Sequence, residues 1–271
     1  MSSTSSKIAA FRKIVLSHYR VHGRHDLPWR KTQDPYKILV SEMMLQQTQV
    51  ERVIPYYKQW LKRFPTVRAL AKAPLSEVLR AWQGLGYNRR AKMLHQAAKE
   101  VITTHKGKFP EQLEVLPGVG PYTARAVQVF SENKDAVCIE TNIRTVVTHH
   151  FFPTTKKVDD KKIQEVLEKA LPRGKSREWH SALMDYGSFL KRSGVRRNAQ
   201  AKSYRKQEPF EGSRRQARGA ILKALTKGPR TAMFLSAVLG PTRKAQLRAQ
   251  LASLTKEGLI ERTKGKFQLP N

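Results

Sequence analysis

The sequence predicts an all-α protein made of two helical bodies, the second of which ends in a small β-hairpin. Apolar residues recur with helical spacing almost throughout residues 7–190, and no run there alternates polar and apolar residues. Residues 191–212 are rich in Lys and Arg and poor in large apolar side chains, which is typical of a linker or a basic arm. Helical spacing resumes after residue 213.

Proline and glycine separate the helices of the first body. Asp34 and Pro35 form a start signal for one helix, and an apolar stripe from Val50 to Phe64 predicts the next, which ends before Pro65. The same spacing between turns with Gly or Pro predicts six further helices, over residues 76–83, 89–104, 122–130, 143–151, 160–171 and 179–189.

Residues 213–271 predict three helices followed by two short strands that meet at Lys264 and Gly265. This order is typical of a winged helix-turn-helix domain. The segment holds 13 Lys and Arg against two Glu, a net charge of +11. Because such a charge needs an anionic partner, we expect the segment to bind DNA. A helical dimerisation module stays open as the alternative.

The whole chain is strongly basic, with 52 Lys and Arg against 21 Asp and Glu and a formal net charge of +31. Nucleic acid is therefore the first partner to expect. The single cysteine, Cys138, excludes disulfides, thiolate zinc sites and iron–sulfur clusters within one chain. The sequence shows neither a signal peptide nor a stretch of about 18 apolar residues. We expect an intracellular protein of the cytoplasm or nucleoid that is not secreted and does not use a membrane.

Glu42 is the first of two carboxylates that the sequence places in opposite environments. It shares a predicted helix face with Ile38 and Leu45. Desolvation on such a face raises the pKa of a carboxyl group, which suits a proton donor near neutral pH. The alternative is an acid at the rim of the face, paired with Arg30 or Lys37.

Glu140 is the second carboxylate, and it precedes a helix expected to begin near Ile143 with Thr141 or Asn142 as its cap. The free amides of a helix start favour a negative charge by roughly 0.3–1 kcal/mol when exposed. One protonated acid and one anion together are typical of glycosidic bond cleavage. The alternative for Glu140 is a role in helix stability alone.

The segment LPGVGPYTARAVQVF predicts a phosphate clamp made of backbone amides. Gly118 and Gly120 permit the positive φ and close approach of a tight hairpin, and Pro121 suits the first position of the next helix. The amides of that helix start then point outward together and bind a phosphate without reading base sequence. The alternative is a plain turn, which does not need two glycines.

These motifs resemble those of the helix-hairpin-helix (HhH-GPD) base-excision DNA glycosylases, which include endonuclease III and the MutY-type adenine glycosylases. The resemblance runs from about Leu27 to Leu190 and is closest to the MutY branch in LPWR, DPYKILVSEMMLQQTQV, GLGYNRRAKML, LPGVGPYTA, KFP and ALMDYG. It implies a two-lobed helical catalytic region over 1–190, followed by the linker over 191–212 and the winged-helix unit over 213–271. It also implies a monomer that acts on double-stranded DNA and excises a mispaired base, above all adenine opposite guanine or 8-oxoguanine.

The resemblance assigns roles to single residues. Glu42 is implied to protonate the adenine ring, and Glu140, supported by Asn142, to stabilise the C1′ cation. Tyr122 stands where bifunctional relatives carry a Schiff-base lysine, and a phenol forms no imine, which implies a glycosylase without lyase activity. The implied wedge into the opened duplex consists of Gln47 and Tyr87 with their neighbours Thr48 and Leu85. The implied walls of the base pocket are Trp29, Arg30 and Asp185.

Three departures from the family are visible in the sequence. The four cysteines that hold a 4Fe-4S cluster in relatives are absent, so we expect no cofactor, and the hairpin remains compatible with a monovalent cation. Glu140 replaces the family's aspartate and adds a reach on the order of 1.5 Å. A winged-helix unit replaces the Nudix-like domain that reads 8-oxoguanine.

Two other functions stay open. Pocket residues outside the motifs choose the base, so uracil, thymine or hypoxanthine remains an alternative target. A non-catalytic DNA-binding or architectural protein is the alternative of another class, in which Glu140 and the missing cluster mark lost activity.

Overall fold

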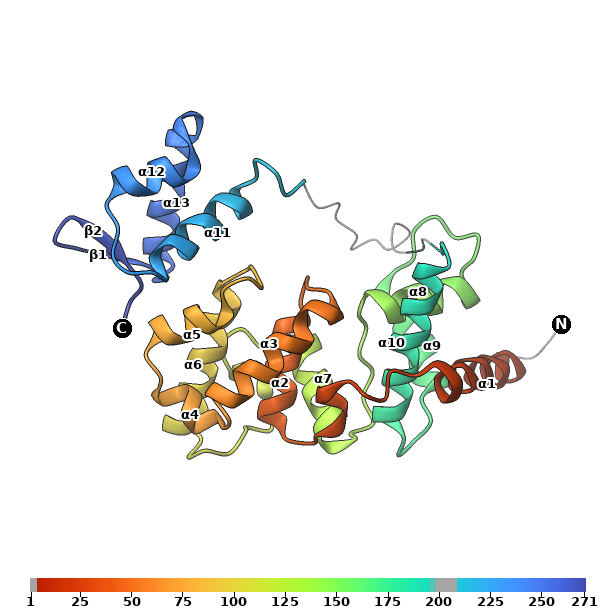
Figure 1. The fold of residues 1–271 in the computed structure, drawn as a ribbon. Coiled ribbons are helices and arrows are strands. Elements are labelled where there is room, and N and C mark those ends of the chain that lie inside the picture. Colours follow the sequence, from red (N-terminus) through yellow and green to blue (C-terminus); the bar gives the residue numbers. More distant parts are fainter. Residues whose placement is uncertain (1–3, 196, 198–208) are drawn as a thin grey trace. The chain divides into compact units, whose positions relative to one another are not determined.

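The computed structural model describes residues 4–195, 197 and 209–271, and nearly all of their regular structure is helical (Figure 1). The predicted all-α class is confirmed. The chain divides into two compact units, one of Met1–Leu39 with Gly120–Lys206 and one of Val40–Val119 with Gln207–Asn271. Within the described residues, no helix combines the length and the apolar character needed to cross a bilayer.

The first unit is a group of helices around an aromatic and aliphatic core. Helix α10 (Ser176–Arg192) packs against α8 (Thr141–Phe151) and α1 (Thr4–His22), and α9 (Asp160–Ala170) packs against α1 and α8. At the centre, Phe11 meets Trp179 edge-to-face with ring centroids 5.7 Å apart, and both side chains are buried. The elements are α1 (Thr4–His22), the 3-10 turn η1 (Pro28–Lys31), α7 (Pro121–Glu132), α8 (Thr141–Phe151), α9 (Asp160–Ala170) and α10 (Ser176–Arg192).

Helix α2 (Pro35–Leu45) continues into the second unit, where α6 (Arg89–Thr103) packs against α4 (Val67–Lys72) and α5 (Leu75–Trp82). Trp60 and Trp82 lie edge-to-face at 5.4 Å in its core. The short helix α4 was not predicted, and it starts where the Thr66 hydroxyl accepts the Ala69 amide at 3.1 Å. The other elements of this segment are α3 (Val50–Arg63), α4 (Val67–Lys72), α5 (Leu75–Trp82), α6 (Arg89–Thr103) and η2 (Leu113–Val115).

The C-terminal segment has the order of a winged helix, as predicted. Its elements are α11 (Arg214–Leu225), α12 (Ala232–Leu239), the turn η4 (Pro241–Arg243), α13 (Lys244–Lys256), β1 (Glu261–Thr263) and β2 (Lys266–Gln268). The two strands pair antiparallel around Lys264 and Gly265, whose φ values are 49° and 76°. Arg230 and Phe267 form an additional antiparallel bridge.

Two predicted boundaries differ from the structure. Helix α8 begins at Thr141, two residues before the expected start, because its cap is Glu140 and neither Thr141 nor Asn142. The predicted linker over 191–212 begins inside α10, which ends at Arg192. Residues 196 and 198–208 of that linker lie outside the described part of the chain.

Candidate active site

Glu42 lies on helix α2 and is only 7% exposed. Its neighbours Ile38 and Met43 are buried, so the predicted desolvation of this carboxyl group is confirmed. The two cations considered as its partners have other carboxylates beside them: Arg30 pairs with Asp185, and the Lys37 ammonium lies 3.9 Å from Asp34.

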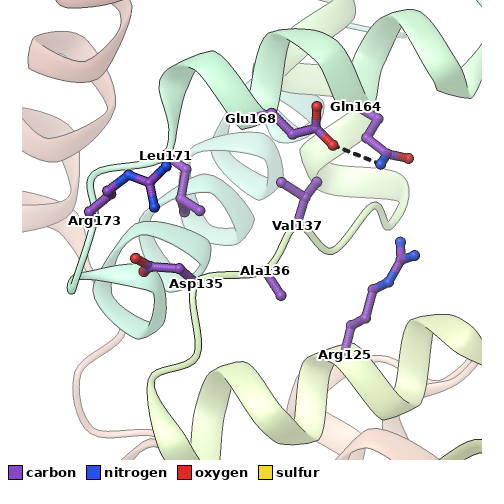
Figure 2. Close-up of a pocket in the computed structure, with 8 residues that line it drawn as sticks. All are labelled: Arg125, Asp135, Ala136, Val137, Gln164, Glu168, Leu171 and Arg173. Atoms are coloured by element: carbon purple, nitrogen blue, oxygen red, sulfur yellow. Dashed lines mark hydrogen bonds between the residues drawn. The ribbon is translucent and has the colours of Figure 1, made fainter.

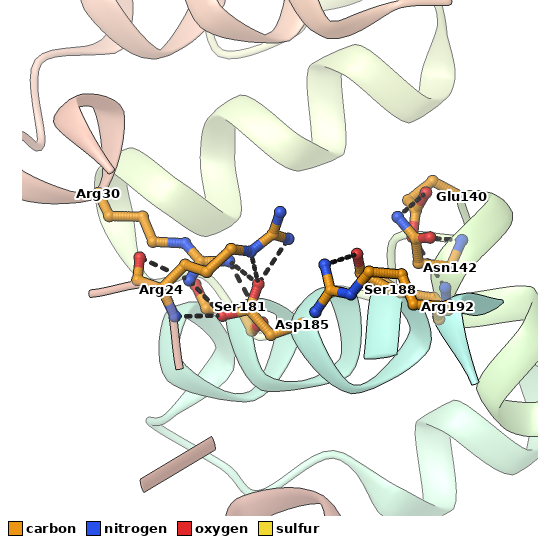
Figure 3. Close-up of polar contacts among 9 residues, drawn as sticks. Arg24, Arg30, Glu140, Asn142, Ser181, Asp185, Ser188 and Arg192 are labelled. Carbon is orange, nitrogen blue, oxygen red and sulfur yellow. Dashed lines mark hydrogen bonds and ion pairs between the residues drawn. The ribbon is translucent and has the colours of Figure 1, made fainter. Parts of the chain in front are cut away.

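Glu140 caps helix α8 with its own side chain (Figure 3). One carboxylate oxygen accepts the backbone amides of Asn142 and Ile143 at 2.7 and 2.8 Å, and the other accepts the Asn142 side-chain amide at 3.2 Å. The expectation that Thr141 or Asn142 caps the helix is wrong, because the longer Glu140 side chain reaches both amides of the first turn. The structure thus brings Glu140 and Asn142 together and holds the carboxylate in one orientation.

Gly187 on α10 lets this carboxylate site form, and the sequence reasoning missed it. A Cβ atom at Gly187 would collide with the Asn142 backbone and with the Asn142 Cβ atom, the latter at 2.8 Å. Only glycine therefore permits the start of α8 to approach α10 so closely. The one available signal was a glycine inside an otherwise regular helix, in the segment ALMDYG.

Asp185 on α10 is the centre of an ion-pair network (Figure 3). Its carboxylate receives two hydrogen bonds from the Arg30 guanidinium, at 2.6 and 2.9 Å, and two from the Nε and the backbone amide of Arg24, at 2.7 and 2.8 Å. Burial by itself raises the pKa of Asp185, but the hydrogen bonds and charges of Arg30 and Arg24 outweigh it. The pKa of Asp185 therefore lies below its ordinary value.

The predicted wedge residues lie on two turns of one unit. Gln47 follows α2 with a φ of 58°, and Tyr87 precedes α6 with a φ of 47°. Both side chains are exposed, while Leu85 is buried and Thr48 is half-buried. Left-handed conformations at residues other than glycine and asparagine are rare and cost about 1–3 kcal/mol each, and they gather at functional sites.

Arg90, which the sequence reasoning did not single out, connects these two turns. Its Nη1 donates to the carbonyls of Met43, Met44 and Gln46, at 2.7, 3.1 and 2.5 Å. Its Nη2 donates to the Thr48 hydroxyl and to the carbonyls of Leu85 and Gly86, at 3.3, 3.2 and 3.0 Å. A signal was present in the sequence, because Arg90 is a charged residue on the face of α6 that also carries Leu94 and Ala97.

The hairpin before α7 agrees with the prediction at one glycine and differs at the other. Gly118 has a φ of 77°, and a Cβ there would lie 2.5 Å from the Cβ of Met93. Gly120 has a φ of −91° and open space where a Cβ would stand, so the expectation that both glycines are sterically required is wrong for Gly120. Pro121 takes the first position of α7 as predicted, and Gly120 offers that helix no side-chain cap.

The remaining predicted residues lie in the first unit. Tyr122 is half-buried in the first turn of α7, and Trp29 is buried in η1. Glu42, the two wedge turns and Gly118 belong to the second unit. Each unit thus brings its own predicted residues into a local arrangement.

A hollow of about 360 Å³ in the first unit is lined by none of the predicted residues (Figure 2). Arg125 and Arg173 contribute its positive charges. Its two acids already accept hydrogen bonds, Asp135 from the Ser176 hydroxyl at 2.9 Å and Glu168 from a side-chain amide at 2.8 Å. The hollow therefore resembles a surface depression between helices more than a prepared binding site.

The residues of this chain do not fit the iron–sulfur cluster that the resemblance implies for relatives. Such a cluster needs four cysteine thiolates, and the chain contains one cysteine. Cys138 is buried before α8, where it packs near Ala126 and Val129. Among the described residues, no group of three or more His, Cys, Asp or Glu side chains is placed to hold a metal ion.

Comparison with known structures shows the same helical fold elsewhere. A thermostable thymine-DNA glycosylase superposes with a TM-score of 0.61 at 29% identity, over 69% of this chain and 88% of that one. A non-covalent endonuclease III–DNA complex gives a TM-score of 0.60 at 19% identity, over 69% and 87% of the two chains. Because the identity to endonuclease III is only 19%, this similarity shows a shared fold and nothing about function.

Sequence comparison identifies relatives and a family. An adenine DNA glycosylase of Mycolicibacterium smegmatis is 35% identical over 278 residues, which cover 94% of this chain and 94% of that protein. One of Buchnera aphidicola subsp. Baizongia pistaciae is 35% identical over 66% of this chain, which spans 52% of that relative's length. The model of the HhH-GPD superfamily base excision DNA repair proteins matches residues 40–173. The chain therefore belongs to the HhH-GPD superfamily of base excision DNA repair proteins.

Proposed function

We propose that the protein is a DNA glycosylase that acts as a monomer on double-stranded DNA and excises adenine mispaired with guanine or 8-oxoguanine. One observation carries the choice of base: an adenine DNA glycosylase aligns with 94% of this chain. Because that alignment covers nearly the whole chain, it must include most of the C-terminal segment. The superposition on the thymine-DNA glycosylase covers only 69% of the chain. The alignment with this relative therefore extends beyond the helical core into the C-terminal segment.

Glu42 is the proposed general acid. Its carboxyl group is buried on α2, and burial favours the protonated form that can donate to a ring nitrogen of adenine. Protonation turns adenine into a neutral leaving base, and the bonding electrons of the C1′–N bond leave with it. Glu42 then accepts a proton from the water that attacks C1′, which yields an abasic site and restores the acid.

Glu140 is the proposed stabiliser of the cation that forms at C1′. Two helix amides and the Asn142 side chain hold its carboxylate in one orientation at the start of α8. A negative charge held in place needs no reorganisation when the oxocarbenium-like transition state forms. Tyr122 cannot form an imine, which supports hydrolysis without a lyase step.

The C-terminal segment and the hairpin are the proposed sites of phosphate contact. The winged-helix segment carries a net charge of +11, and the exposed side chains of Lys244 and Arg248 lie along α13. The amides at the start of α7, next to Gly120, suit a phosphate. The proposed division is a catalytic region over 1–190 and a winged-helix unit over 213–271, without an iron–sulfur cluster.

The test is a labelled duplex with adenine opposite 8-oxoguanine or guanine, incubated with the protein and then heated in alkali. We expect a strand break at the adenine only after alkali, because excision leaves an abasic site that the protein itself does not cut. Glu42→Gln should abolish the break and retain DNA binding. The matched control is Glu51→Gln, an exposed acid on the neighbouring helix α3, which should leave excision unchanged. Full activity of Glu42→Gln would refute the assignment of the acid.

A second candidate keeps the chemistry and changes the base to thymine. The structural similarity to a thymine-DNA glycosylase, with a TM-score of 0.61, favours this candidate. The same assay tests uracil and hypoxanthine as target bases. A panel of duplexes with each base opposite guanine separates the candidates. Excision of thymine or uracil without adenine would replace the first proposal. Tight, salt-dependent binding without any abasic product would show a non-catalytic DNA-binding protein.

A further inference from the structure

The turns that carry Gln47 and Tyr87 share an unusual backbone. Both residues adopt a left-handed conformation, with φ values of 58° and 47°, although neither is a glycine or an asparagine. Such conformations persist only where the surroundings hold them in place. Contacts from the surroundings of these two turns must therefore hold both backbones firmly.

The guanidinium of Arg90 supplies those contacts. Its two terminal nitrogens donate to five carbonyls and one hydroxyl, distributed over the segments 43–48 and 85–86. Two of the acceptors, the carbonyls of Met43 and Met44, belong to the last turn of α2, where a cation is favourable. The same guanidinium lies over the rings of Trp82 and Tyr87, at 5.2 and 5.5 Å.

Arginine has the shape that this position requires. Arg90 is 9% exposed, and burial lowers its pKa to about 10, so the side chain remains charged near neutral pH. Its planar fork reaches acceptors on two separate turns at once, whereas a lysine ammonium is a single compact point of charge. The position therefore depends on the fork as well as on the charge.

We propose that Arg90 is a positioning residue that locks the turns of Gln47 and Tyr87 into one rigid pair, so that both side chains enter the duplex together. Arg90 itself lies beneath the exposed residues and acts through them. The proposal rests on the proposed function and on the predicted wedge role of the two residues, in which the inserted pair opens a base pair before the base is excised. Without the lock the two turns move independently, and the cost of ordering them is added to each base-opening event.

This role predicts a selective loss of activity. Opening a paired base requires the wedge, whereas an adenine that is already unpaired in a single-base bulge requires it much less. Arg90→Lys should therefore lower the single-turnover rate on a paired duplex by about 10- to 100-fold and the rate on a bulged adenine far less. A general loss of folding would lower both rates equally.

The experiment combines this rate comparison with hydrogen–deuterium exchange on the free full-length protein. In Arg90→Lys, amides in segments 44–49 and 84–88 should lose protection together, while the centre of α6 stays protected. Trp82→Phe removes the 3.0 Å hydrogen bond from the indole to the Gly86 carbonyl and should loosen segment 84–88 alone. The matched control is Arg12→Lys, because Arg12 caps α9 through the carbonyls of Ala170 and Lys169, both at 2.8 Å. It should leave both turns and both rates unchanged.

Each outcome decides the proposal. Joint loosening of both turns together with a selective loss on the paired duplex supports it. Unchanged protection of either turn, or equal losses on paired and bulged adenine, overturns it. If the wild-type protein excises neither adenine, the proposed function fails, and the exchange measurement still decides whether Arg90 locks the two turns.

Discussion

Asp185→Asn tests the ion-pair network of the first unit. The Asp185 side chain is 2% exposed, and its partners Arg24 and Arg30 are 24% and 11% exposed. Asparagine keeps the shape of the side chain but removes the charge and replaces one acceptor oxygen with an NH₂ donor. Two guanidinium groups would then face a neutral amide in a buried place.

The expected cost follows from this burial. Removing one partner of a buried ion pair costs about 3–5 kcal/mol, because the remaining charge is left without compensation. The arginines retain some access to solvent, so we expect the lower end, about 3 kcal/mol. With a urea dependence of about 1–3 kcal/mol/M, the unfolding midpoint of the unit should fall by about 1 M or more.

The same network predicts a pH dependence of stability. The pKa of Asp185 is lower in the folded protein than in the unfolded chain, so the unfolded chain binds the proton more readily. The stabilisation is fully present above the ordinary carboxyl pKa and is lost as the pH falls through the lower, folded value. Asp185→Asn should therefore remove part of the acid sensitivity of the wild-type protein.

Urea unfolding followed by tryptophan fluorescence measures both effects. The matched control is Asp160→Asn, because Asp160 forms a similar two-bond pair with Arg144, at 2.7 and 2.9 Å, but is 43% exposed. Arg144 is only 13% exposed, but water reaches the exposed side of Asp160, so we expect this pair to contribute about 1 kcal/mol or less and the midpoint to fall by at most a third as much. Equal shifts in the two variants would contradict the reasoning from burial.

Three further predictions follow from single sites. Gly118→Ala should destabilise the protein by about 2 kcal/mol, whereas Gly120→Ala should change its stability by less than about 0.5 kcal/mol, as measured by urea unfolding. Burial and nearby positive charges lower the pKa of His150 to about 4, so its NMR titration should centre there, and its contribution to stability should fade as the pH drops from 6.5 toward 4. A centre near 6.5 would contradict its burial. Replacing Lys244 and Arg248 with Gln should lower the slope of log binding constant against log salt by about 1.8, and an unchanged slope would remove α13 from the DNA interface.

Local chemistry made much of the fold predictable. The Asp34–Pro35 start signal and the helical spacing around it predicted α2, and the same spacing predicted the burial of Glu42, which the structure confirms. The wing was predictable because Lys264 and Gly265 suit a two-residue hairpin turn. All of these features depend on residues within a few positions of one another, where spacing determines which face a side chain shares.

The cap of α8 and the different roles of the two hairpin glycines could not be predicted from the local sequence. The sequence offered several polar residues at the start of α8, and only the backbone path decided that Glu140 itself accepts the two amides. Two glycines in LPGVG are equivalent in the sequence, yet only Gly118 has a positive φ and a neighbouring helix close by. The two glycines differ because helix packing places side chains next to Gly118 and leaves open space next to Gly120.

The sequence by itself determined most of the helices, their order and the family, because these depend on local spacing and on contiguous motifs. Only the tertiary structure decided which distant residues meet. Asp185 pairs with Arg30 across 155 positions of the chain, and Arg90 reaches Gln46 across 44. Such contacts depend on how the helices pack against one another, and no local sequence pattern predicts which residues so far apart in the chain come into contact. The rigid support under the proposed wedge is therefore visible only in the folded protein.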